Sequence, residues 1–153
     1  MTVLFYDPYV TASDDGGGEA VADLQTLVGR ADFVSLHARA SAENENLFDA
    51  AMFTAMKPGA YFVNTAREGL VDEDALDAAL SSGRLAGAAL DVVRASDRRG
   101  LNPLLRHDNV VITPHIGGAT YETLSRGVQM VCDDVRRFGA GEPLLRVANR
   151  QAG

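Results

Sequence analysis

The chain has a single cysteine among its 153 residues, so it cannot form an internal disulfide framework. Cys132 lies within an apolar pattern of helical period, where we expect a small buried thiol and not a catalytic one. The histidines, the cysteine and the acidic residues show no spacing typical of metal ligands. We therefore expect neither disulfides nor a bound metal.

Basic residues are in the minority, with 14 lysines and arginines against 21 acidic residues and a net charge of −7. They are scattered along the chain and form no cationic stripe for the phosphates of nucleic acid or for an anionic membrane. We expect no nucleic acid and no membrane among its partners.

Long apolar runs are also missing. No segment approaches the roughly 20 apolar residues of a membrane helix, and the amino terminus lacks the basic and apolar segments of a secretory signal. We expect a cytoplasmic protein. The hydrophobic fraction of 46% is enough for one buried core, and no repeat or linker divides the chain, so we expect a single domain over residues 1–153.

What is present is an alternation of short β-rich runs with helical patterns. The five β-rich runs are Thr2 to Tyr6, Phe33 to His37, Ala60 to Asn64, Gly87 to Val93, and Asn109 to Thr113. Such alternation is typical of the α/β class, in which helices cover a parallel sheet.

Three helices are predicted from apolar periodicity. One includes Val21, Leu24 and Val28 and ends at Gly29. Another begins near Asp72 and ends at Gly83, and acidic residues in its first turn suit the helix dipole. The longest runs from about Thr120 to Phe138, with a stripe of Leu124, Val128, Val131 and Val135. A short helical turn is expected at Pro103 to Arg106.

Polar residues follow the carboxyl ends of all five expected strands. They are Asp7, His37, Thr65 with Arg67, Asp91, and His115. In open parallel sheets this edge is where ligands bind, so we expect a site there. Two alternatives stay open: Asp7 caps a turn with Pro8, and His37 is a histidine satisfied at the end of its strand.

Asp7 supports a sharper hypothesis. An acidic residue at the end of a strand in a dinucleotide-binding fold accepts hydrogen bonds from ribose hydroxyls, about 20 residues after a glycine-rich loop. Only six residues precede Asp7 here. The run Gly16 to Gly18 does not replace that loop, because Val21 stands where the third glycine belongs. We interpret the run as a flexible loop before a helix.

Arg67 and His115 are the candidate reactive groups. A guanidinium at a ligand-binding edge can hold a carboxylate through two parallel hydrogen bonds. The alternative for Arg67 is a surface salt bridge with Asp72 or Glu73. His115 lies between a strand and a helix, and imidazole exchanges protons near neutral pH. The alternative is a loop histidine without a catalytic part.

Taken together, six runs carry a resemblance to one family. They are Tyr6 to Tyr9, Ser35 to Ala38, Met56 to Ala60, Asn64 to Arg67, Leu85 to Val92, and Thr113 to Gly118. In order and spacing they resemble the D-isomer-specific 2-hydroxyacid dehydrogenases, of phosphoglycerate dehydrogenase-like type, over nearly the whole chain. The resemblance implies a partial Rossmann-type, doubly wound parallel sheet that lacks its first strand and glycine-rich loop.

The resemblance also implies site roles. Asp7 would bind the adenosine ribose and favour NAD over NADP, and Asp91 would hold the nicotinamide carboxamide. The residues that would line the rest of the cofactor cleft are His37, Ala38, Thr65, Ala66 and, beside the nicotinamide, Gly117. Arg67 would bind the carboxylate of a small 2-hydroxy or 2-keto acid, and His115 would be the general acid and base.

Three positions depart from the family pattern. Ser96 stands where a glutamate orients the histidine, and the neighbouring Asp97 is a possible replacement. Arg39 stands where proline is usual, and Glu68 where glycine is usual.

The resemblance further implies that the first strand, the glycine loop and the substrate domain precede Met1. On that basis we expect weak cofactor binding and either a homo-oligomer or a complement from a missing N-terminal half. The alternative function is that of a noncatalytic truncated remnant or association module.

Overall fold

The computed structural model describes residues 1–10, 17–94 and 102–147. The chain divides into two compact units, Met1–His115 and Ile116–Gly153, and each is described by itself. The expectation of one domain over residues 1–153 stays a prediction.

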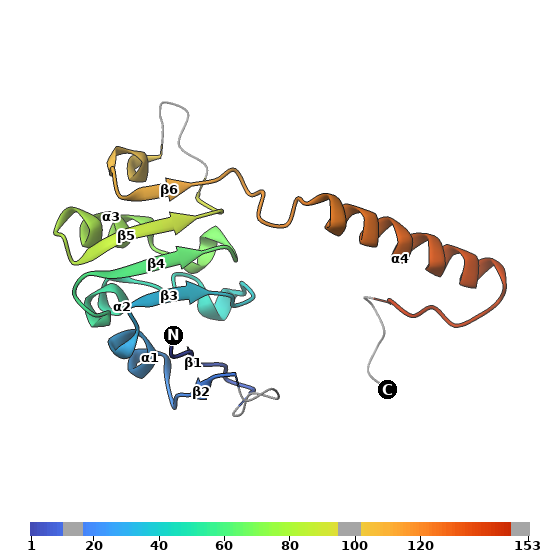
Figure 1. Ribbon diagram of the computed structural model, residues 1–153, viewed down its shortest axis with the longest axis horizontal. Coiled ribbons are helices and arrows are strands. Elements are labelled where there is room, and N and C mark those ends of the chain that lie inside the picture. Colours follow the sequence, from blue (N-terminus) through green and yellow to red (C-terminus); the bar gives the residue numbers. More distant parts are fainter. Residues whose placement is uncertain (11–16, 95–101, 148–153) are drawn as a thin grey trace. The chain divides into compact units, whose positions relative to one another are not determined.

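The centre of the first unit is a four-stranded parallel sheet (Figure 1). Its strands, in spatial order, are β3 (Phe33–Leu36), β4 (Ala60–Asn64), β5 (Leu85–Leu90) and β6 (Val110–Ile112). The last residues of three strands are in register, since Leu36 is level with Asn64 and Asn64 with Leu90. The predicted α/β class and the parallel sheet are confirmed.

The first predicted strand belongs to a separate sheet. β1 (Leu4–Phe5) pairs in parallel with β2 (Glu19–Ala20), a two-residue strand that the sequence pattern did not predict. Consequently Asp7, which follows β1, does not follow a strand of the four-stranded sheet.

Helices connect the strands of the first unit. They are α1 (Leu24–Arg30), α2 (Ala50–Ala55), α3 (Glu73–Ser81) and the 3₁₀ helices η1 (Ala42–Asn44), η2 (Glu68–Leu70) and η3 (Pro103–Arg106). Each α-helix begins after an aspartate, Asp23, Asp49 or Asp72, whose side chain accepts a backbone N–H of the first turn. The N–H of Thr26 lowers the pKa of Asp23 below its ordinary value, because it stabilises the carboxylate. The predictions for α3 and η3 are confirmed. The helix predicted before β3 is present as α1, but it begins at Leu24, after Val21, and continues through Gly29 to Arg30. The six-residue α2 had not been predicted.

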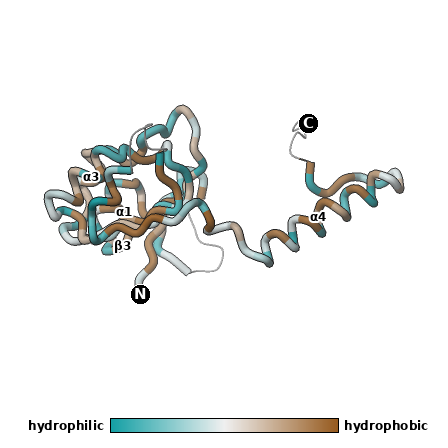
Figure 2. Tube along the Cα trace, turned by 90° about the horizontal axis from the view of Figure 1, so that it is seen from above, coloured by the Kyte–Doolittle hydropathy of each residue, from teal (hydrophilic) through white to brown (hydrophobic). Residues whose placement is uncertain are grey.

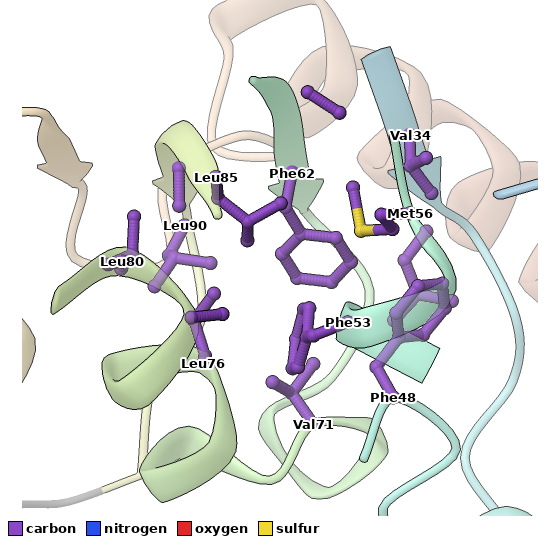
Figure 3. Close-up of a cluster of buried hydrophobic side chains, with 14 of the residues drawn as sticks. Val34, Phe48, Phe53, Met56, Phe62, Val71, Leu76, Leu80, Leu85 and Leu90 are labelled. Carbon is purple, nitrogen blue, oxygen red and sulfur yellow. The ribbon is translucent and has the colours of Figure 1, made fainter. Parts of the chain in front are cut away.

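The hydrophobic core lies on one face of the sheet (Figure 3). Phe48, Phe53 and Phe62 are each at most 1% exposed, and their rings contact one another with centroids 4.8 to 5.8 Å apart. Leu76 and Leu80 of α3 belong to the same cluster. These contacts anchor α2 and α3 beneath the sheet, and burial of large aromatic side chains is the main stabilising contribution.

The opposite face of the sheet is much more exposed. Phe33 and Tyr61 stack with ring centroids 5.0 Å apart, yet remain 65% and 43% exposed. Val111 of β6 is 63% exposed. Buried and more exposed side chains therefore alternate along β3 and β4, as in a sheet covered on one face.

The second unit contains the long helix α4 (Tyr121–Gly139), whose N-cap Thr120 accepts the N–H of Thr123. The predicted length is confirmed. The stripe of Leu124, Val128, Val131 and Val135 is 63% to 66% exposed, and apolar and polar stretches alternate along α4 in Figure 2. Cys132 is exposed too, so the expectation of a buried thiol is wrong. The segment after the helix bonds back to it, with Leu145 and Arg146 at Asp134, but leaves Cys132 and the apolar stripe exposed. Within the described ranges, no helix is long and apolar enough to cross a membrane.

One position of the sheet, Gly87, leaves no room for a side chain. A Cβ added at Gly87 would lie 2.6 Å from the backbone oxygen of Asn109 and 3.2 Å from the Tyr61 ring. Since real Cβ atoms do not approach a backbone oxygen so closely, β5 and the turn before β6 would have to separate.

We predict that Gly87→Ala lowers the free energy of unfolding by roughly 1 to 3 kcal/mol, the usual cost of overpacking. Urea denaturation followed by circular dichroism measures it. The matched control is Gly29→Ala in α1, where the new Cβ would make an ordinary 3.7 Å contact with the oxygen of Ala55. Equal stability of the two variants would contradict the close approach at Gly87.

Candidate functional site

Two loops at the carboxyl edge of the sheet are joined by backbone hydrogen bonds. Asn46, in the loop after β3, donates its N–H to the oxygen of Gly69 at 2.9 Å, and Phe48 donates to Leu70 at 3.0 Å. Asp72 donates back to the oxygen of Phe48 at 3.0 Å. The loop after β3 and the loop after β4 therefore form one structural unit at this edge.

An open pocket of about 570 Å³ lies between these loops. Its lining residues are His37, Ala38, Arg39, Ala40, Thr65, Ala66, Arg67, Glu68 and Gly69. Five residues assigned to the site from the sequence are therefore brought together here: His37, Ala38, Thr65, Ala66 and Arg67. The pocket carries two guanidinium groups and one carboxylate, so its charge is opposite in sign to that of the whole chain.

Asn64, the last residue of β4, fixes the turn that presents Arg67. Its side chain is buried at 1% exposure. The amide oxygen accepts the N–H of Ala66 at 2.9 Å, and the amide nitrogen donates to the backbone oxygen of Arg67 at 3.0 Å. Both ends of the amide are thus used to hold the chain in one conformation where it leaves the sheet.

Arg67 is exposed, and one of its terminal nitrogens donates to the oxygen of Ala66 at 2.6 Å. It makes no ion pair with any described residue. Asp72 caps α3, and Glu73 accepts the N–H of Arg94 and the side-chain amide of Asn102. The alternative of a surface salt bridge from Arg67 to Asp72 or Glu73 is therefore wrong.

The structure also shows local partners for His37 and Asp7. A hydrogen bond of 2.8 Å joins His37 Nε2 to Ser35 Oγ, and Nδ1 of this exposed side chain makes no hydrogen bond with any described residue. Asp7 Oδ1 accepts the N–H of Tyr9 at 2.8 Å, as in the turn-capping alternative. The second carboxylate oxygen of Asp7 has no partner in the described part of the chain, so turn capping and ligand binding are compatible.

Asp91 and His115 lie next to each other after β5 and β6. Asp91 is 7% exposed, and its Oδ1 accepts the hydroxyl of Thr113 at 2.5 Å. The backbone N–H of His115 donates to the backbone oxygen of Asp91 at 2.9 Å. Neither residue is among those that line the pocket.

His115 has a backbone φ of +56°, in the left-handed region. Residues with a Cβ adopt this region at a cost, and such conformations are frequent at functional sites. The following residues, Ile116 and Gly117, belong to the second unit. The expected place of Gly117 beside the nicotinamide stays a prediction, and Gly16, Ser96 and Asp97 lie outside the described residues.

Asn64 and four residues that line the pocket, Arg39, Ala40, Glu68 and Gly69, had not been assigned to the site from the sequence. Asn64 was part of a recognised run, and an asparagine at the end of a strand is itself a signal for a side-chain-capped turn. Arg39 had been noted only as a departure from the family pattern, and its place in the pocket depends on the fold of the loop after β3.

Comparison with known proteins agrees with this arrangement. The family described as D-isomer specific 2-hydroxyacid dehydrogenase, NAD binding domain, matches residues 1–117. The chain is 37% identical over 150 residues to D-3-phosphoglycerate dehydrogenase of Archaeoglobus fulgidus, covering 97% of this chain and 28% of that protein. It is 40% identical over 139 residues to (S)-sulfolactate dehydrogenase of Chromohalobacter salexigens, covering 90% of this chain and 45% of the relative.

A solved structure, D-lactate dehydrogenase with NAD⁺ from Lactobacillus jensenii, superposes with a TM-score of 0.87 at 27% identity, over 97% of this chain and 48% of that one. The chain thus spans less than half the length of these relatives.

We predict that Asn64→Ala lowers the free energy of unfolding by about 1 to 3 kcal/mol, because it leaves the N–H of Ala66 and the oxygen of Arg67 without their partner. Thermal and urea unfolding measure the loss. Asn109→Ala is the control, because it removes an exposed hydrogen bond from the side-chain amide to the backbone oxygen of Ala86 at the other edge of the sheet. It should lower the free energy of unfolding by less. A loss at Asn64 no larger than at Asn109 would show that the turn does not depend on the buried amide.

A second pair of variants tests the backbone at His115. Both His115→Gly and His115→Ala delete the imidazole. Only alanine keeps a Cβ, which makes the left-handed backbone conformation costly. We expect the glycine variant to be more stable than the alanine variant by about 1 kcal/mol, the usual difference at a left-handed position. Urea denaturation of both variants decides it, and an alanine variant of equal or greater stability would disprove the strain.

Proposed function

The chain belongs to the D-isomer specific 2-hydroxyacid dehydrogenase family through its NAD-binding domain, and on that premise we propose that it serves the NAD-dependent interconversion of a small 2-hydroxy acid and its 2-keto acid. Arg67 binds the carboxylate and His115 is the general acid and base. The observation that carries this proposal is the exposed guanidinium of Arg67, which lines the pocket and has no carboxylate partner among the described residues.

The residues present fit a dinucleotide. The carboxylate oxygen of Asp7 that has no partner among the described residues suits a ribose hydroxyl. The walls formed by His37 with Ala38 and Thr65 with Ala66 suit an extended ligand at the edge of the sheet. Asp91 is the acceptor proposed for the carboxamide, close to the backbone of His115. When bound, NAD supplies the hydride-transfer chemistry.

Arg67 orients the acid. Its terminal nitrogens can hold both oxygens of a carboxylate, which fixes the position of the adjacent carbon. The guanidinium also places positive charge beside the keto oxygen, where negative charge develops during reduction. The buried amide of Asn64 keeps the backbone of Arg67 in one place for this task.

His115 moves the proton. In the direction of reduction, an imidazole nitrogen donates a proton to the substrate oxygen, and in the direction of oxidation the same nitrogen accepts it. Two hydrogen bonds to Asp91, from the Thr113 hydroxyl and from the backbone N–H of His115, hold the backbone of His115 directly after β6 and support this role.

The names of the relatives support a small organic acid as the substrate. D-3-phosphoglycerate and (S)-sulfolactate, after which two of them are named, each carry a second anionic group besides the carboxylate. Lactate, from the name of the solved neighbour, carries only the carboxylate. We propose the same class of acid for this chain.

Association without turnover is the second candidate function. It is favoured by the exposed apolar stripe of α4, because contiguous exposed apolar surface marks an interaction site. The partner is then another copy of the chain or a polypeptide that completes the enzyme.

Calorimetric titration with NADH separates the two candidates. We expect saturable binding that Asp7→Ala weakens about tenfold, the effect of one charge-assisted contact. The same substitution should weaken the binding of NADPH less, because Asp7 in the unsubstituted chain would repel the additional phosphate of NADPH. The control is Asp108→Ala, an exposed aspartate at the start of β6 on the opposite edge. If the purified chain shows no binding of NADH at millimolar concentration, the oxidoreductase proposal fails for this chain and association becomes the preferred function.

A further inference from the structure

We propose that Arg94 is a positioning residue of the cofactor site. Its guanidinium links the segment after β5, which begins with Asp91, to the loop after β3 that forms one wall of the pocket. This inference rests on the proposed function, because it takes Asp91 as the acceptor of the nicotinamide carboxamide and the wall as a contact of the same cofactor. In this role Arg94 contacts no reacting atom and acts through the relative position of the two parts.

The side chain of Arg94 makes a contact between distant segments. One of its terminal nitrogens donates to the side-chain oxygen of Asn46 at 2.5 Å, across 48 positions of the sequence. Asn46 lies in the loop after β3, and Arg94 follows Asp91 by three residues. The bond therefore joins segments that leave two strands, β3 and β5, with β4 between them.

Asn46 is also joined to the loop after β4. Its backbone N–H donates to the oxygen of Gly69 at 2.9 Å, and Gly69 lines the pocket. The backbone φ of Asn46 is +53°, in the left-handed region that asparagine adopts more readily than most residues. Through Asn46, the segments after β3, β4 and β5 form one hydrogen-bonded chain at the carboxyl edge of the sheet.

The backbone of Arg94 is itself held by α3. Its N–H donates to Glu73 Oε1, at the start of this helix, at 2.5 Å. The other carboxylate oxygen of Glu73 accepts the side-chain amide of Asn102 at 2.8 Å, and Asn102 is only 8% exposed. The guanidinium thus extends from an anchored main chain, so its bond to Asn46 positions the loop after β3 relative to Asp91.

The cofactor is the ligand that spans the two linked parts. A ligand that contacts both the wall and Asp91 loses less entropy on binding when the two are already held together. ADP-ribose is NADH without the nicotinamide, so it has no carboxamide for Asp91. The link should therefore raise the affinity for NADH and leave that for ADP-ribose unchanged, which makes ADP-ribose the matched probe.

Calorimetric titration with both probes tests this difference. We expect Arg94→Met to weaken NADH binding about threefold to tenfold and ADP-ribose binding by less than about twofold. Asn46→Gly removes the acceptor but tolerates the left-handed backbone, so it should have the same effect. The double variant should be no weaker than either single variant, because both substitutions break one bond. Arg94→Lys keeps one charged donor and should restore part of the affinity.

The control for the loss of charge is Arg106→Met. Arg106 is an exposed arginine of η3, before β6, and it pairs with Asp77 of α3. Like Arg94 it connects a loop segment to another element, but it lies outside the carboxyl edge of the sheet. Its substitution should leave the affinities for NADH and ADP-ribose unchanged.

Amide hydrogen exchange tests the link in the chain without ligand. The backbone N–H groups of Asn46 and Phe48 donate to the loop after β4. Arg94→Met should speed their exchange at least about threefold, because the loop after β3 then opens more often. The exchange of Phe62 in the middle of β4 should stay the same.

The outcomes separate this role from the proposed function. The role of Arg94 is overturned if the exchange of Asn46 and Phe48 does not change, if Arg94→Met weakens both probes equally, or if Asn46→Gly has no effect. Saturable NADH binding that Arg94→Met does not weaken overturns the role of Arg94 and leaves the proposed function intact. If the unsubstituted chain binds neither probe, the proposed function fails, and the cofactor role of Arg94 fails with it.

Discussion

The parallel pairing of β3, β4, β5 and β6 is the constraint on which the site depends. It brings the carboxyl ends of four strands to one edge, so residues separated by up to 78 positions, from His37 to His115, leave the sheet on the same side. Hydrogen bonds then hold the chain where it leaves the strands. After β4 they come from the buried amide of Asn64, and after β5 and β6 they join Thr113 and His115 to Asp91. The rings of Phe48 and Phe53 pack against Phe62 of β4 and so support the strand from one face.

Much of the fold could be predicted, because strands and helices of sufficient length have a clear apolar period. The bounds of β4 and η3 agree with the prediction, and α3 and α4 differ from theirs by about one residue. The two-residue β2 and the six-residue α2 are too short for a period to be recognised. The burial of α4 was overestimated, since an apolar stripe shows which face is apolar but not what covers it.

The site could be predicted in part. Residues directly after a strand, such as His37, Thr65 and Arg67, lie together as expected, because strand direction alone places them. Arg39 could not be assigned in this way: its contribution depends on how the loop after β3 folds back onto Gly69, and such loop contacts leave no periodic signal. The alternatives for Arg67 also needed the structure, since only there are Asp72 and Glu73 seen to be occupied by backbone and amide donors.

The stripe along α4 makes the solubility of the chain depend on the choice of salt. Leu124, Val128, Val131 and Val135 present apolar surface to the solvent. Sulfate and phosphate strengthen the association of such surfaces because they are excluded from them, whereas the net charge of −7 opposes association most strongly at low ionic strength. Dilute buffers with chloride as the anion therefore favour a dispersed chain, and ammonium sulfate, a common precipitant, favours precipitation through α4.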